Sequence, residues 1–416
     1  MADMRTTNQR TPWIAAIIAG ALAELLFLWN LARPAKPVFD EVYYVEAARA
    51  IARLYAPYNI EHPMLAKTFM AAGILIFGDN PVGWRFFSTL SGAAIVMGGM
   101  AIAWQLSNRL RPALLTAGFL GVNQTLYMQS RLAMLDGFMA AFLVLAVATM
   151  LAAARRQWSL GWLILSGALL GAAIGSKWAA VPFLGFAGLS IPLLRWVDRG
   201  GARPRRFGSI GTLPAMAALG ISAAAVYLLS FAPAFFYKYS PLTLTSLWSE
   251  QLRMYLAQTQ QPPLHSYQSP WWTWPLDLRP IWYLYEPVDG VWRGVFFVGN
   301  PVVFWGGLLA VAACLWIGWR ERSRPLLGIA ALWIGAFGIW AVVPKKIGFL
   351  YYYYPASLFI CLALAFALDR ARWRWAGEAV LAAAAAVFIY FYPILSAAPL
   401  SDDQAFKAYI LLPTWP

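Results

Sequence analysis

The sequence contains few charged side chains, two cysteines and two histidines. Only 12% of its 416 residues are charged and 61% are hydrophobic, whereas about a quarter of the residues of a soluble protein are charged. Polar groups cannot cover a surface of this composition, so we infer that lipid is the solvent. Two histidines, His62 and His265, are too few for a zinc cluster. Cys314 and Cys361 both lie in apolar runs, which leaves a disulfide undecided.

Sequence patterns for nucleotide binding are also missing. The chain has neither a phosphate-binding glycine loop nor a dinucleotide fingerprint. The net charge of +14 would in itself fit a nucleic-acid partner. The basic residues, however, form short clusters between apolar runs, which is typical of loops that anchor a chain at a membrane. We therefore expect membrane lipids and no nucleic acid as partners.

About eleven apolar runs are long enough to be membrane-spanning helices. They lie near residues 12–32, 86–106, 113–129, 136–154, 159–175, 178–194, 209–231, 301–318, 326–343, 351–369 and 377–395. The first run is too long for the core of a signal peptide and no small-residue cleavage pattern follows it, so we treat it as an anchor. The predicted fold is an all-α integral membrane protein with a single domain over residues 1–416.

Lysine and arginine are unequally distributed between the loops. Of the 32 basic residues, 17 lie in the N-terminal segment and in loops that share its side if there are eleven spans. Because cytoplasmic loops carry the excess of positive charge, the N-terminus is predicted in the cytoplasm and the C-terminus outside. Two long aromatic segments, near 33–85 and 232–300, then lie on the outer side. We expect the functional site there.

The first outer segment carries an acidic pair, Asp40 and Glu41, at the start of an amphipathic pattern. Glu46 and Arg49 fall on its polar face and Tyr44 falls on its apolar face, which predicts a short helix in the membrane plane. In the structural alternative, Asp40 is only the N-cap and Glu41 only a first-turn acid of this helix. A carboxylate at this position could also act as a general base toward a hydroxyl. The local pattern leaves both interpretations open.

Further polar residues follow in the outer segments. Pro63 predicts a second short helix, with His62 just before it and Lys67 one turn in. A loop histidine and a snorkelling lysine are the structural alternative. Arg131 and Asp136 lie close to bilayer depth, where charges are costly and either pair or take part in function. A salt bridge between these two is the structural alternative.

Cations recur on the same side of the membrane. Lys177 lies at a tight outer turn, where it would face a lipid headgroup or a phosphate. Arg279 lies in an aromatic run that an interfacial aromatic belt explains, apart from the arginine itself. Lys345 and Lys346 oppose the positive-inside bias and would suit an anionic headgroup, unless they are a tolerated exception. Acids, cations and aromatic rings on one face fit sugar transfer from a lipid phosphate.

These stretches resemble, in the same order, motifs of the protein O-mannosyltransferase family. The motifs are "FDE", "HPMLAK", "SRLAMLD", "GSKW", "WWTWPLDLRPI" and "GNPVVFW", and they recur over about residues 38 to 360. The family comprises multispan glycosyltransferases of the C superfamily that use a polyprenyl-phosphate sugar. Each motif is weak alone, but the ordered set is fairly specific.

The resemblance implies an eleven-span C-superfamily fold with an outward cavity. It implies inverting transfer of a sugar, with mannose inherited from the family, to a Ser or Thr hydroxyl of a protein at a bacterial plasma membrane. Asp40 would be the catalytic base and Glu41 would help to place the acceptor. The donor site would comprise Arg131, Asp136, Lys177 and Arg279, with support for the acceptor or the loops from His62, Lys67, Trp271 and Trp272. Lys345 and Lys346 are added to the donor site from their predicted outer position and not from the resemblance. No cofactor is implied, although some superfamily members use a divalent metal.

The sequence departs from the family pattern at two places. Met64 follows Pro63 where the family often has a second proline. The loop between the seventh and eighth predicted spans has only about 70 residues, whereas eukaryotic members carry a large soluble domain there. This difference fits a compact bacterial-type member and leaves the acceptor open. The alternative acceptor is a lipid or cell-envelope glycan, as in the related aminoarabinose transferases, and the alternative class is a transporter.

Overall fold

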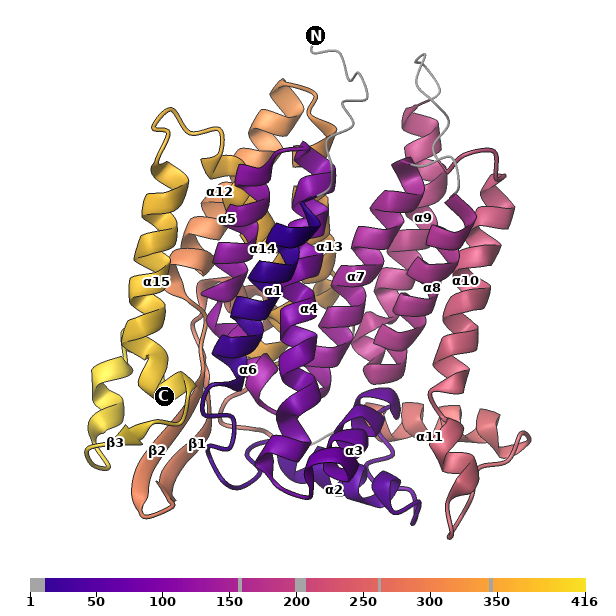
Figure 1. The fold of residues 1–416 in the computed structure, drawn as a ribbon, viewed down its shortest axis with the longest axis vertical. Helices are drawn as coiled ribbons and strands as arrows, with labels where there is room; N and C mark the ends of the chain where they lie inside the picture. The colour runs from indigo at the N-terminus through magenta and orange to yellow at the C-terminus, as the bar shows by residue number, and fades with distance from the viewer. Residues whose placement is uncertain (1–11, 156–158, 199–206, 261–262, 344–346) are drawn as a thin grey trace.

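The computed structural model describes residues 12–155, 159–198, 207–260, 263–343 and 347–416. Within these ranges, nine helices are long and apolar enough to cross a membrane, which confirms the predicted helical membrane class. Figure 1 shows the long helices running side by side in one bundle. They are built on α4 (Pro81–Ser107), α7 (Leu135–Arg155), α8 (Ser159–Ser176), α9 (Val181–Val197), α10 (Thr212–Leu229), α12 (Pro301–Arg320), α13 (Arg324–Gly338), α14 (Tyr354–Leu368) and α15 (Ala376–Leu395).

Two of the eleven predicted spans are shorter than expected. Helix α1 (Trp13–Leu28) has 16 residues and is therefore about 24 Å long. The predicted span 113–129 is divided into α5 (Leu110–Gly121) and α6 (Gln124–Arg131). Asn123 begins α6 by accepting hydrogen bonds from two backbone N–H groups of its first turn. The count of eleven is thus not confirmed, because an asparagine cap interrupts one apolar run.

Small residues set the distance between several helices. A Cβ atom added to Gly171 of α8 would lie 2.2 Å from the carbonyl oxygen of Ala223 of α10. Such close backbone contact is typical of helices that pack in a membrane. Helix α14 lies at the centre of the bundle, since 89% of its apolar window is buried, whereas α9 lies at the rim with 17%.

The remaining elements gather at one end of the bundle, the lower end in Figure 1. They are α2 (Glu41–Ala52), α3 (Leu65–Phe77), α11 (Ser246–Thr259) and the strands β1 (Ile281–Val288), β2 (Val291–Phe297) and β3 (Pro399–Leu400). Helices α2 and α3 match the two short helices expected after the first apolar run. The antiparallel sheet, with strand order β1-β2-β3, was not expected. It turns at Asp289 and Gly290, which both have positive φ, a geometry typical of a tight hairpin turn.

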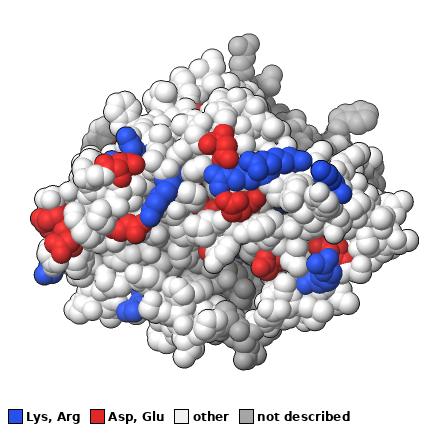
Figure 2. Space-filling model, turned by 90° about the horizontal axis from the view of Figure 1, so that it is seen from below, with Lys and Arg blue, Asp and Glu red and all other residues white. Residues whose placement is uncertain are grey.

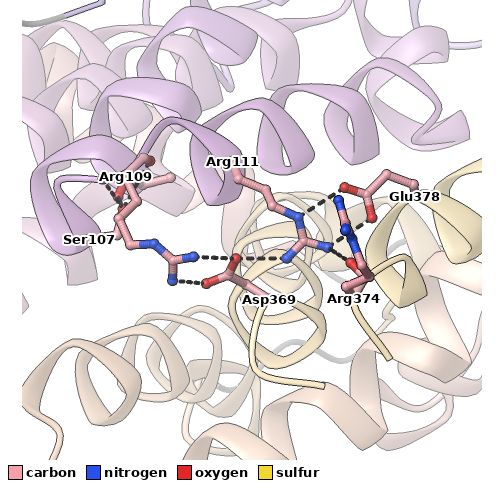
Figure 3. Close-up of polar contacts among 7 residues, drawn as sticks. Ser107, Arg109, Arg111, Asp369, Arg374 and Glu378 are labelled. Carbon is pink, nitrogen blue, oxygen red and sulfur yellow. Dashed lines mark hydrogen bonds and ion pairs between the residues drawn. The ribbon is translucent and has the colours of Figure 1, made fainter. Parts of the chain in front are cut away.

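Short loops connect the spans at the opposite, upper end of the bundle. Arg111, at the start of α5, donates to both carboxylate oxygens of Glu378 at 2.9 and 2.8 Å and to Asp369 at 2.9 Å. Arg109 binds the same Asp369, and Figure 3 shows both arginines converging on it. Some of the arginines from which the cytoplasmic side was predicted are therefore paired with acids of a neighbouring loop.

The lower end carries charges of both signs. Figure 2 shows basic and acidic side chains lying next to one another across this face. Ion pairs account for several of them, such as Arg49 with Asp79 at 2.9 Å and Arg253 with Glu250 at 2.9 Å. Any anionic ligand at this end must therefore be recognised by local geometry, because the face is not uniformly basic.

Candidate active site

Asp40 occupies the N-cap position of α2, but its side chain makes no capping hydrogen bond. Its Oδ2 atom instead accepts a hydrogen bond from the hydroxyl of Tyr44, one turn further along the helix, at 3.3 Å. The sequence left open that Asp40 serves only as a helix cap. The structure does not support this alternative, because the carboxylate caps no backbone N–H group. Its carboxylate faces a cavity.

The cavity beside Asp40 has a volume of about 260 Å³. Its walls come from α2, from the loop before α3, from the turn between α8 and α9, from α11 and from the chain around α13 and α14. The other lining residues are Tyr44, Glu61, His62, Lys177, Trp178, Ala179, Pro182, Gln258, Ile339, Trp340, Val343, Tyr351 and Tyr352. Two carboxylates, one lysine and several aromatic rings thus line one small cavity.

The cavity changes the acidity of Asp40. Burial disfavours the charged form and raises the pKa of the Asp40 carboxyl to about 6, an effect that Lys177 opposes and Asp136 reinforces. A carboxyl with this pKa is ionised at neutral pH and is a stronger base than an exposed aspartate. These are the properties that a general base needs near pH 7.

Lys177 and Asp136 form a buried ion pair behind Asp40. The lysine Nζ lies 2.9 and 2.7 Å from the two carboxylate oxygens, and it also lies over the rings of Tyr351 and Tyr352 at 5.2 and 5.6 Å. The sequence allowed a pair between Arg131 and Asp136, but the structure gives Asp136 a different partner. The ammonium group of Lys177 is therefore held in place at the wall of the cavity.

A small void of about 10 Å³, room for about one water molecule, lies beside this ion pair. It shares Ala179, Ile339, Trp340 and Tyr352 with the main cavity, and Asp136 is one of its lining residues. The rest of its lining is apolar: Met139, Phe183, Ala336 and Pro355.

Glu41 does not line the cavity, although it is adjacent to Asp40 in the sequence. It is fully buried, and its carboxylate binds the guanidinium of Arg85 of α4 at 2.8 and 2.7 Å. The backbone N–H groups of Val38 and Ala133 donate to the same carboxylate at 3.0 and 2.6 Å. Glu41 therefore anchors the start of α2, and its geometry is that of a positioning residue.

Two of the predicted donor-site arginines lie outside the cavity as well. Arg131 donates to the hydroxyl of Tyr127 at 2.6 Å and to the carbonyl oxygen of Asn30 at 2.7 Å. Arg279 donates to the carbonyl oxygens of Ser266 and Thr414. Neither residue belongs to the cavity lining. Lys345 and Lys346 lie outside the described residues, so their role stays a prediction.

The residues predicted to support loops or the acceptor have different surroundings. Lys67 is buried and donates to the carbonyl oxygens of Asn59 and His62 at 2.7 and 2.8 Å, which fixes the loop that brings His62 to the cavity. Trp271 packs on Phe337 with ring centroids 5.0 Å apart, and Trp272 is exposed. Lys67 thus supports a loop, while neither tryptophan lines the cavity.

Sequence reasoning missed Arg85, Tyr351 and Tyr352. Arg85 lay one residue before a predicted span, and an ionisable residue at such a position is a signal that needs a partner. The tyrosines belong to a run of four, which composition alone does not distinguish from an interfacial belt.

The burial of the Glu41–Arg85 pair leads to a stability prediction. Glu41→Gln leaves the Arg85 guanidinium buried without a counter-charge, so we expect the free energy of unfolding to fall by about 3–5 kcal/mol. Arg253→Gln, which breaks an exposed pair, should change it by less than about 1 kcal/mol. Denaturant unfolding of both variants in the same detergent measures the difference. Equal effects of the two substitutions would contradict an anchoring role for Glu41.

Comparison with known proteins places these features in context. Residues 71–239 match the family model described as dolichyl-phosphate-mannose-protein mannosyltransferase, and residues 243–415 match that of the C-terminal four-span region of protein O-mannosyltransferases. The two matches together cover most of the chain.

Curated relatives are similar over most of their length. A polyprenol-phosphate-mannose–protein mannosyltransferase of Mycobacterium tuberculosis is 26% identical, over 86% of this chain and 80% of that protein. Its counterpart in Corynebacterium glutamicum is 24% identical, over 78% of this chain and 77% of that protein.

Solved structures share the fold at low sequence identity. A chain of the Saccharomyces cerevisiae protein O-mannosyltransferase Pmt1-Pmt2 complex, bound to the sugar donor, aligns with a TM-score of 0.80 and 16% identity, over 100% of this chain and 93% of that one. ArnT of Cupriavidus metallidurans in the apo state aligns with a TM-score of 0.65 and 19% identity, over 95% and 68%.

Proposed function

The chain belongs to the dolichyl-phosphate-mannose-protein mannosyltransferase family, and from this premise we propose that it transfers mannose from a polyprenyl-phosphate carrier to a Ser or Thr hydroxyl of a protein. The family makes it a membrane-embedded glycosyltransferase. The names of the curated relatives support the donor and the protein acceptor. The chemistry rests on Asp40, whose carboxylate does not cap α2, has a raised pKa and lines the same cavity as the fixed cation of Lys177.

The proposed reaction is a direct displacement at the anomeric carbon. The Asp40 carboxylate takes the proton of the acceptor hydroxyl, and the acceptor oxygen forms a bond to C1 of the sugar. The bond between C1 and the phosphate oxygen breaks, and its electron pair remains on the phosphate. The products are the glycosylated side chain, with inverted configuration, and polyprenyl phosphate. The proton leaves Asp40 to solvent afterwards.

Lys177 is assigned to the departing phosphate. Among the described residues it is the one lysine or arginine that lines the Asp40 cavity. Its ion pair with Asp136 holds the ammonium in position before a donor arrives, so little reorganisation is needed as charge develops on the phosphate.

Removal of the Asp40 charge tests the assignment of the base. We expect Asp40→Asn to reduce transfer to a peptide by a factor of about 10² to 10⁴, because the hydroxyl loses its proton acceptor. Donor affinity should stay near that of the unmodified chain. Single-turnover transfer and binding of a polyprenyl-phosphate sugar measure the two quantities. Comparable turnover by the variant would remove Asp40 from this role.

The raised pKa predicts a specific pH dependence. Because the base must be deprotonated and burial raises the pKa of Asp40 to about 6, kcat/KM should fall about tenfold per pH unit below pH 6. An aspartate of ordinary pKa would keep its activity down to about pH 4. Return of acid-treated enzyme to pH 7 controls for unfolding. A flat profile between pH 7 and pH 4.5 would contradict the raised pKa of Asp40 as the titration that controls transfer.

We also propose that the lower end faces the outside of a bacterial plasma membrane, as the basic loops at the upper end suggest. Both native cysteines are buried, so an introduced cysteine can be labelled selectively. In intact cells, a membrane-impermeant maleimide should label the Ser401→Cys variant, whose site is exposed at the lower end. The Arg322→Cys variant, exposed at the upper end, should react only after permeabilisation. The reverse pattern would overturn the orientation.

A lipid or cell-envelope glycan is the alternative acceptor, since the chain also shares its fold with ArnT. Membranes that contain the chain are incubated with labelled polyprenyl-phosphate mannose and separated into protein and lipid fractions. The proposal expects the label in protein, released by treatment that cleaves O-linked sugars. Label in lipid or envelope glycan alone would replace the protein acceptor with one of those classes.

A further inference from the structure

Strand β1 lies at the edge of the sheet and has a partner on one side only. It pairs with β2 along Ile281–Val288, and the strand order β1-β2-β3 leaves its other edge open. Among the described residues, the backbone hydrogen bonds outside helices and ladders include none to residues 281–288. An open edge presents N–H and C=O groups that can pair with another extended chain.

The hairpin geometry indicates which groups point outward. Val288 and Val291 close the two-residue turn and Glu286 is opposite Arg293, two pairs along the ladder. In an antiparallel ladder, hydrogen-bonded and non-bonded pairs alternate from such a turn. Tyr285 and Pro287 therefore direct their backbone groups to the open edge. A proline without an N–H at an outward position is typical of an edge strand.

A groove follows this edge. It has a volume of about 460 Å³. Five consecutive residues of β1 line it, numbers 282 to 286, across the register shift of the ladder between Trp282 and Leu284. Tyr267, Phe406 and Pro416 supply the other walls. The groove thus combines unpaired backbone with aromatic surface.

Ring contacts connect the groove to the reaction cavity. Tyr283 of β1 stacks on Phe39, with centroids 4.1 Å apart and planes 7° apart, and Phe39 directly precedes Asp40. Phe39 also meets Tyr351, a lining residue of the cavity, at 6.0 Å. Ion pairs of Lys36 with Glu286 and of Arg33 with Asp289 hold the same loop against the hairpin. Figure 1 shows β1 as the strand nearest to α2.

We propose that the open edge of β1 binds the acceptor polypeptide as an additional antiparallel or parallel strand and so presents its Ser or Thr hydroxyl to Asp40. This inference rests on the proposed function, which requires an extended stretch of protein at the cavity. Strand addition takes its affinity from main-chain hydrogen bonds, while side chains of the bound peptide occupy flanking pockets. The occupant is therefore an unfolded segment of the acceptor, held through its backbone.

A backbone N-methyl scan of an acceptor peptide tests the proposal without changing the enzyme. Each peptide carries one N-methyl group at a successive position beside the modified Ser or Thr. In a strand, every second N–H faces the partner. We therefore expect the KM for peptide to rise roughly three- to tenfold at alternate positions and to change little between them.

A matched pair of variants tests the same contact from the enzyme. Tyr285→Pro and Tyr285→Ala both remove the phenol, but only the first removes the outward N–H of this residue. We expect the KM for peptide to be roughly three- to tenfold higher for Tyr285→Pro than for Tyr285→Ala, with equal kcat at saturating peptide. Equal donor binding by the two variants shows that both are folded.

The outcomes separate this inference from the function on which it rests. Transfer to peptide with a period-two scan and a difference between the two variants supports strand addition. Transfer with an irregular or flat scan and equal variants overturns strand addition and leaves the proposed function intact. Failure of the unmodified chain to modify any peptide, while it modifies lipid or glycan, overturns both.

Discussion

The buried pair of Glu41 and Arg85 is the interaction on which the site depends. The guanidinium binds both carboxylate oxygens of Glu41, and it also donates to the carbonyl oxygens of Leu31, Pro34 and Lys36 in the loop before α2. The Glu41 carboxylate in turn receives the N–H of Ala133. One ion pair therefore joins α4, the first loop, α2 and the turn before α7. Because every group is satisfied, the pair can stay charged in a buried place.

This anchor explains why two acids stand side by side in the sequence. Neighbouring residues at a helix start point in different directions, so Glu41 turns into the protein while Asp40 turns to the cavity. The anchored helix has no need of Asp40 as a cap, and its carboxylate remains available to a ligand. Lys177, fixed by Asp136, completes the arrangement from the turn after α8. A base for the acceptor and a cation for the phosphate are thus positioned by separate structural pairs.

Much of this arrangement could be predicted from the sequence, because apolar runs, loop charge and an amphipathic pattern are local signals. The short helix after Asp40 and the shared side of the two long aromatic segments follow from them. Contacts between distant segments could not be predicted in this way. Arg85 of α4 pairs with Glu41 of α2, and Asp136 pairs with Lys177, whereas the sequence suggested Arg131 as its partner. The hairpin did carry a local signal, Asp-Gly between aromatic residues, but an expectation of helices and aromatic belts concealed it.

Removal of the acceptor proton by Asp40 can be tested by changing the acidity of the acceptor group. Transfer by the unmodified chain and by Asp40→Ala is measured with two peptides that differ only in Ser or Cys at the modified position, at pH 9, where a thiol of pKa about 8.5 is largely ionised. We expect the variant to be strongly impaired with Ser and close to the unmodified chain with Cys, because a thiolate needs no base. An equal defect with both peptides would contradict proton removal by Asp40.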